Sequence, residues 1–168
     1  AGAGGAGPRA GRWGVGGGGG GDRRTGGAGP MPEARLGAAD ATGNREYAAT
    51  GMRALEFLAD ITQSGTLFVP IGNQGWRLRS GARAFYDQQP IEACAMVDAW
   101  LAAQRLTGEF TYRDAAQVAF DWFHGGNTER LALAIPDTGA CYDGLHAGHV
   151  NQNQGAETHA PPTHPDTG

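Results

Sequence analysis

Cysteine, excess positive charge and long apolar runs are all scarce in this sequence of 168 residues. The cysteines, Cys94 and Cys141, are too few for the disulfide framework of a small secreted protein. The formal net charge of −4 gives no basic surface for nucleic acid. No apolar run is long enough to span a bilayer, and the first residues lack the pattern of a secretory signal. These absences favour a reducing, cytoplasmic compartment.

Motifs of nucleotide-binding and hydrolytic enzymes are also missing. Residues 14–21 look like a phosphate loop, but no strand precedes them and no Gly-Lys-Ser/Thr ending follows. No dinucleotide fingerprint or nucleophile elbow is present, so we expect no cofactor. His124, His146 and His149 suggest a metal site, but no cysteine or carboxylate stands beside them at a recognised ligand spacing. We therefore expect no metal ion.

Glycine, in contrast, is abundant, with 30 residues, of which about half precede Met31. Residues 1–30 contain few large apolar side chains to offset the entropy of ordering, so they are predicted to be disordered. Met31 could be the true start of the protein. Residues 158–168 contain three prolines and are predicted to be an irregular tail. The folded domain is expected over residues 31–157.

Four helical patterns follow one another in this domain. Residues 32–41 are rich in alanine, and residues 91–106 are apolar on nearly every side, which is typical of a helix buried all round. Both segments stop at a Thr-Gly pair. Residues 45–61 and 112–123 carry their apolar side chains on one stripe, as amphipathic helices do.

Several residues sharpen these expectations. Pro90 suits the first position of a helix, and Gln89 before it becomes the expected cap. Thr111 and Asp114 have nearly the spacing of a capping box. The large aromatic residues expected in the core are Trp100, Trp122 and Phe123.

The two halves of the domain repeat the same pattern of a helix, a Thr-Gly break and a striped helix. The matching positions are Thr42-Gly43, Tyr47, Leu55 and Leu58 in the first half and Thr107-Gly108, Tyr112, Phe120 and Phe123 in the second. Each αα-hairpin leaves an apolar face that a neighbouring hairpin must cover. The sequence therefore predicts an all-α fold, an αα-hairpin array that forms part of an (α/α)6 toroid, with disordered ends.

Two long polar connections, residues 63–89 and 125–157, follow the striped helices. They are expected to leave the helical array at the same end. Loops of this length in a compact domain are usually functional or disordered. We expect the functional site where the two connections meet. The candidate catalytic acids there are Asp87, Glu92, Asp143 and Glu157.

Five strings in the domain are similar to those of a known family. The strings are Ile71–Trp76, Phe85–Ala93, Ala119–Phe123, Gly139–Leu145 and Val150–Glu157. Together they resemble a bacterial helical domain that is found in, or beside, glycosyltransferases and is similar to six-hairpin glycosidase-like toroids. The resemblance covers residues 32–157 and implies carbohydrate metabolism more firmly than any one reaction. The family continues after the last string with another apolar helix, which this chain lacks, so the resemblance also implies a fragment.

The candidate acids allow two interpretations. Sugar chemistry at an anomeric carbon needs one carboxylic acid and one carboxylate, which these residues could supply. Alternatively, Glu92 only interacts with the dipole of its helix, and Asp87 and Asp143 only form turns. The sequence leaves open whether the domain is an enzyme.

Polar and aromatic side chains of the same connections could bind the substrate. Amide groups suit sugar hydroxyls, but they could equally hold their own loop backbone in place. Aromatic rings could stack on a sugar or pack the loops onto the helix ends. The candidate substrate-binding residues are Asn73, Trp76, Gln88, Gln89, Tyr142, Asn151, Asn153 and Gln154.

Three functions therefore compete. The first is binding or processing of a carbohydrate. The second is a non-catalytic accessory module that positions a glycosyltransferase or its acceptor. The third is a helical protein-interaction module, and an inactive truncated fragment is a further alternative. No nucleic-acid or membrane partner is expected.

Overall fold

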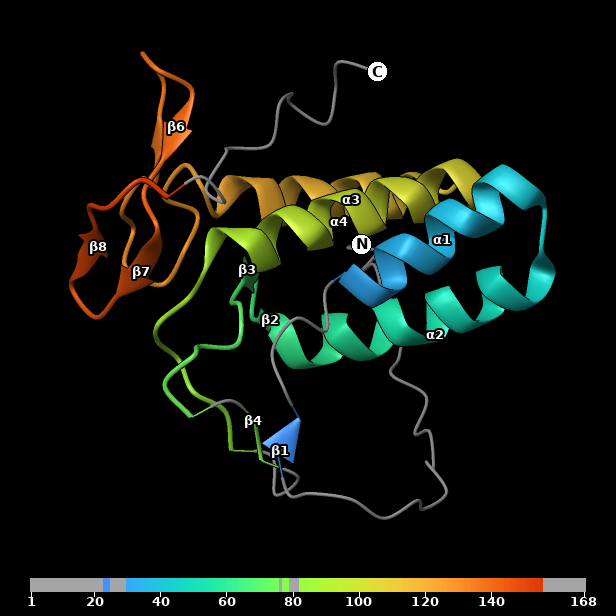
Figure 1. Cartoon of the computed structure of the whole chain (residues 1–168), viewed down its shortest axis with the longest axis horizontal. Coiled ribbons are helices and arrows are strands. Elements are labelled where there is room, and N and C mark those ends of the chain that lie inside the picture. The colour runs from blue at the N-terminus through green and yellow to red at the C-terminus, as the bar shows by residue number, and fades with distance from the viewer. Residues whose placement is uncertain (1–22, 25–29, 76, 79–81, 156–168) are drawn as a thin grey trace, which may run out of the picture.

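The computed structural model describes residues 23–24, 30–75, 77–78 and 82–155. These residues form four helices, which make two antiparallel hairpins packed side by side (Figure 1). The first helix packs on the second and also on the third, and the third packs on the fourth. The helices are α1 (Pro30–Thr42), α2 (Arg45–Thr62), α3 (Pro90–Thr107) and α4 (Phe110–Asp121).

The predicted helix boundaries are confirmed within two residues. The Asn44 side chain caps α2 by accepting hydrogen bonds from two backbone N–H groups of its first turn. Pro90 occupies the first turn of α3, and Gly108 ends this helix with a positive φ of 76°. Gln89 is the cap residue of α3, but its side chain makes no capping hydrogen bond. The predicted capping box is wrong, because α4 begins one residue before Thr111.

The core forms around α3, which is buried on several sides, as its apolar sequence predicts. Trp122 and Phe123 are fully buried, and their rings meet edge to face at 5.1 Å. Trp100 is also buried and stacks on Tyr112, with 5.7 Å between the ring centroids. The prediction of these three large residues in the core is confirmed.

Short strands of two or three residues lie before, between and after the helices. They pair as two-stranded antiparallel sheets, β1 with β4, β2 with β3, β5 with β6 and β7 with β8. The strands are β1 (Arg23–Arg24), β2 (Gln63–Ser64), β3 (Leu67–Phe68), β4 (Arg77–Leu78), β5 (Ala134–Ile135), β6 (Ala140–Cys141), β7 (Gly144–His146) and β8 (His149–Asn151).

This mixed architecture of helices and small sheets shows that the predicted all-α fold, an αα-hairpin array forming part of an (α/α)6 toroid, is wrong. The two helical hairpins exist, but the segments interpreted as loops contain strands. Strands of two or three residues are too short to show an alternating pattern in the sequence. The turns of the last two hairpins do carry a sequence signal, because each contains a glycine. Gly139 and Gly148 have φ values of 69° and 74° there.

The segments predicted to be disordered, residues 1–30 and 158–168, lie almost entirely outside the described residues. Among the residues that the structure describes, no helix has the length and hydropathy needed to cross a membrane.

Candidate functional site

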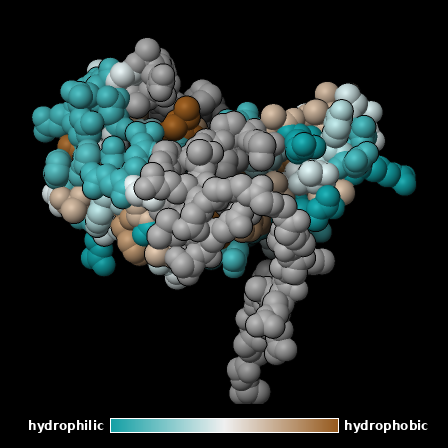
Figure 2. Space-filling model, turned by 60° about the horizontal axis from the view of Figure 1, so that its bottom comes forward, coloured by the Kyte–Doolittle hydropathy of each residue, from teal (hydrophilic) through white to brown (hydrophobic). Residues whose placement is uncertain are grey.

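The two long polar connections meet at one end of the helices, beside the start of α3 and beyond the end of α4 (Figure 1). Residues 71–75, 85–89 and 143–155 form this region, which we call the loop end. Figure 2 shows mostly hydrophilic residues on the side of the molecule that holds the last two hairpins. The loop end therefore combines segments that are far apart in the sequence.

Backbone hydrogen bonds join the three segments of the loop end. The N–H of Asn73 donates to the carbonyl oxygen of Asp87 at 3.0 Å. Gln88 and Leu145 exchange N–H···O bonds of 3.1 and 2.9 Å, so segment 85–89 adds to the edge of β7. These bonds fix Asp87 and the residues of β7 in one rigid arrangement.

Gln88 is buried and anchors the loop end to the core. Its Oε1 accepts a hydrogen bond of 2.8 Å from the indole N–H of Trp122. Its Nε2 donates to the carbonyl oxygen of Phe85 at 2.9 Å and to the hydroxyl of Thr128 at 3.2 Å. Both donors and the acceptor are occupied by the protein, so this candidate substrate-binding residue holds the loop rather than facing a ligand.

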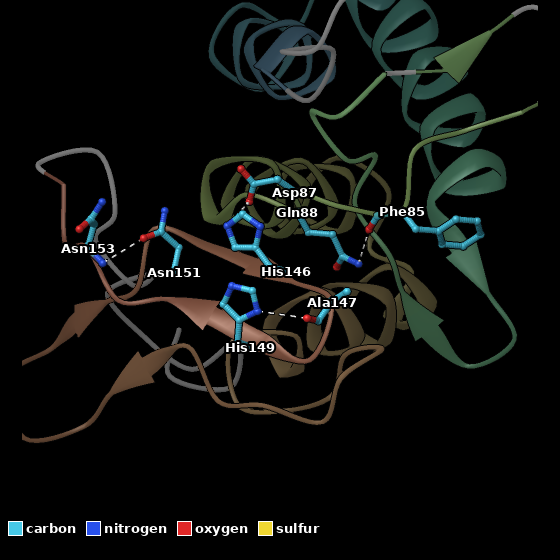
Figure 3. Close-up of polar contacts among 8 residues, drawn as sticks. All are labelled: Phe85, Asp87, Gln88, His146, Ala147, His149, Asn151 and Asn153. Atoms are coloured by element: carbon cyan, nitrogen blue, oxygen red, sulfur yellow. Dashed lines mark hydrogen bonds and ion pairs between the residues drawn. The ribbon is translucent and has the colours of Figure 1, made fainter.

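Asp87 lies at the centre of the loop end with an incomplete set of partners. Its side chain is 22 % exposed, and its Oδ1 is buried without a hydrogen bond. The Nε2 of His146 lies 3.5 Å from Oδ1 (Figure 3). Gly144 permits this arrangement, because a Cβ atom there would lie 2.5 Å from the same oxygen.

His146 faces a second imidazole across its hairpin. His146 and His149 are directly paired in the register of β7 and β8, and their rings stack at 5.0 Å with an angle of 8° between the planes (Figure 3). The Nδ1 of His149 lies 3.1 Å from the carbonyl oxygen of Ala147. Two imidazoles and one carboxylate therefore lie together at the loop end.

Glu129 holds the turn of the β7–β8 hairpin through hydrogen bonds. One of its carboxylate oxygens accepts a hydrogen bond from the Tyr86 hydroxyl, and the other accepts one of 2.8 Å from the N–H of Gly148. These bonds lower the pKa of Glu129, and the bond to Glu129 raises the pKa of Tyr86. The carboxylate thus connects segment 85–89 with the turn of the β7–β8 hairpin.

Asp143 and Asn151 stabilise the segment that follows β8. The Oδ1 of Asp143 accepts a hydrogen bond of 2.7 Å from the N–H of Gly155, and the Oδ1 of Asn151 accepts one of 3.2 Å from the N–H of Asn153. The N–H of Asp143 is shared between the carbonyl oxygens of Asn151 and Asn153. In contrast, the side chains of Asn153 and Gln154 are exposed and accessible to a ligand.

The remaining candidates have varied surroundings. Glu92 lies in the first turn of α3, where a carboxylate is favoured by the helix dipole, and Gln89 precedes that helix. Tyr142 packs against the core. Trp76 and Glu157 lie outside the described residues.

The sequence does not point to His146 or Glu129 as carbohydrate-site residues, whereas Tyr86 is among the aromatic residues that could stack on a sugar or pack the loops. The partner of Glu129 is distant in the sequence, because Tyr86 and Glu129 are separated by 43 positions. The sequence suggests His146 only as a metal ligand, because its proximity to Asp87 follows from the strand pairing and not from a local spacing.

Metal binding and cysteine chemistry receive no support from the described part of the chain. No group of three His, Cys, Asp or Glu side chains there is arranged to hold a metal ion. Cys94 and Cys141 form no disulfide, and burial raises their pKa to about 11 and about 12. Neither is a thiolate near neutral pH, so neither is a candidate nucleophile.

A mostly apolar hollow lies between α2, α3, α4 and the β2–β3 hairpin, and it contains none of the residues of the loop end. It is lined by Ala59, Thr62, Gln63, Leu67, Phe68, Met96, Trp100, Ala115 and Val118.

No known family model matches this chain, and no curated protein matches it significantly. The residues of the loop end therefore carry the functional interpretation.

Proposed function

We propose that the loop end binds a carbohydrate. The observation that carries this proposal is the partly exposed carboxylate of Asp87, which lies beside His146 on a rigid backbone. The exposed amides of Asn153 and Gln154 belong to the same region. Carboxylate, imidazole and amide groups together can accept from and donate to the neighbouring hydroxyls of a sugar. Such polar groups at the rim of an apolar core are typical of small-molecule sites.

Asp87 is also the acid best placed for catalysis, if the bound sugar is processed. The carboxylate of Asp143 already holds Gly155, and Glu92 lies in a helical turn. Sugar hydrolysis at an anomeric carbon uses a pair of acids. An imidazole next to a carboxylate can also transfer protons. Turnover by the folded protein, lost in Asp87→Asn, would extend the proposal from binding to processing.

Calorimetric titration with a panel of glycans tests the proposed site. Asp87→Asn keeps the size of the side chain but removes its charge, and it should weaken binding about tenfold or more, as expected for loss of a charged hydrogen-bond acceptor. Asp114→Asn is the matched control, because Asp114 is exposed in the half of α4 remote from the loop end. The helical circular dichroism of both variants should match the wild type. Equal glycan affinity of wild type and Asp87→Asn would contradict the proposal.

Two alternatives predict other outcomes of the same titration. Binding without turnover would favour an accessory module that positions a glycosyltransferase or its acceptor. Absence of any glycan affinity in the folded protein would favour a protein-interaction module. We also propose a reducing, cytoplasmic setting, which is supported by the absence of a disulfide at Cys94 and Cys141.

A further inference from the structure

We propose, on the basis of the carbohydrate site proposed above, that His146 contacts the ligand directly. Its imidazole is held on one side by Asp87 and accepts a hydrogen bond from a ligand hydroxyl on the other. Asp87 and His146 then act as one recognition unit.

Asp87 selects which nitrogen of His146 carries the hydrogen. A buried carboxylate oxygen without a donor is strongly destabilising. The Nε2 of His146, 3.5 Å from that oxygen, is placed to supply the missing donor. Contacts of this length in a ligand-free site commonly shorten when the ligand binds. A hydrogen on Nε2 leaves the lone pair of neutral His146 on Nδ1.

The Nδ1 atom of His146 is available to a ligand. The side chain is 24 % exposed. Among the described residues, one buried side-chain polar atom lacks a hydrogen bond, and it is Oδ1 of Asp87. The Nδ1 of His146 is therefore not a buried atom without a partner. An acceptor at this position, next to the partly exposed carboxylate, suits a hydroxyl group of a neutral sugar.

His149 provides an internal contrast. Its Nδ1 lies 3.1 Å from the carbonyl oxygen of Ala147, which can only accept, so this nitrogen carries the hydrogen. The two stacked rings therefore present different nitrogens as acceptors. His146 is tied to a carboxylate, whereas His149 is tied to the backbone of its own turn.

The test is calorimetric titration of the full chain with maltotriose, cellotriose and mannotriose. The wild type should bind at least one of these trisaccharides. His146→Ala should bind it about tenfold more weakly, as expected for loss of one hydrogen bond. His124→Ala is the matched control, because His124 is an exposed histidine outside the loop end, and it should retain the wild-type affinity.

A conservative variant separates ligand contact from a structural role. His146→Asn places an amide oxygen close to the position of Nδ1. It should recover part of the affinity lost in His146→Ala. A His146→Ala protein that binds as tightly as the wild type, or a His146→Asn protein that binds no better than His146→Ala, would overturn the assignment of His146 and leave the carbohydrate site intact. Absence of trisaccharide binding by the folded wild type would overturn both.

Discussion

The helical body and the loop end are held together by different forces. Helices α1 to α4 are stabilised by burial of apolar side chains such as Leu55 and Phe123. The loop end depends on specific polar bonds, with Gln88 and Glu129 each joining segments far apart in the sequence. The body therefore supplies stability, and the loop end supplies the polar groups of the proposed site. Substitutions in the two regions should have distinct effects, which makes the comparison testable.

Leu55→Ala should have the largest effect on stability. Leu55 is fully buried between the helices, so its truncation removes apolar contacts and leaves a cavity. Such substitutions lower the free energy of unfolding by about 2–5 kcal/mol. Urea denaturation followed by circular dichroism measures the change. The exposed residue Phe110 provides the control, since Phe110→Ala should cost much less. Similar costs for the two variants would contradict the assignment of stability to the buried body.

Gln88→Leu should have an intermediate effect. The new side chain cannot pair with the indole N–H of Trp122, which then remains buried without an acceptor. A loss of about 1–3 kcal/mol in the free energy of unfolding is expected. Gln152→Leu, at an exposed position near β8, should change stability by less than about 0.5 kcal/mol. An equally stable Gln88→Leu protein would show that the loop end is not anchored through this residue.

Glu129→Gln should make the loop end less sensitive to acid. Hydrogen bonds from Tyr86 and Gly148 lower the pKa of Glu129 below its ordinary value of 4.5. Its stabilising contribution is therefore complete above that value and disappears as pH falls through the lowered pKa of the folded state. The difference in unfolding midpoint between wild type and variant should shrink in acid. A difference that stays constant from neutral pH down to about pH 3 would refute the role of these bonds.

The last prediction concerns the reactivity of the two cysteine thiols, and it involves no change in stability. Burial raises the pKa of Cys94 in α3 to about 11 and that of Cys141 in β6 to about 12. Both should react slowly with iodoacetamide at about pH 8 in the native protein and rapidly in urea, because the thiolate is the reactive form. Mass spectrometry of the alkylated peptides distinguishes the two sites. Fast native labelling of Cys141 alone would show that the β5–β6 hairpin opens independently of the helical body.

The sequence predicts the helical body well because its signals are local. Pro90 and Gly108 mark the ends of α3, and the apolar pattern between them predicts its burial. For the loop end, the sequence predicts only that the two connections meet, which follows from the order of the helices. It does not predict the strands, because they are too short to leave a pattern, and the predicted all-α fold is therefore wrong.

Individual roles at the loop end depend on partners that no local pattern reveals. Gln88 looks like a ligand-binding amide in the sequence, but its acceptor is used by Trp122, which lies 34 positions away. His146 gains its relation to Asp87 only through the pairing of Gln88 with Leu145. Long-range strand register thus decides which polar residues remain accessible and which hold the fold.

The most direct test of the carbohydrate site is chemical-shift mapping of the ¹⁵N-labelled protein during titration with the same trisaccharides. The proposed site predicts shifts confined to residues 71–75, 85–89 and 143–155, with Asp87 and His146 among the largest. Shifts centred instead on the apolar hollow beside Trp100, or no shifts at all in the folded protein, would contradict it.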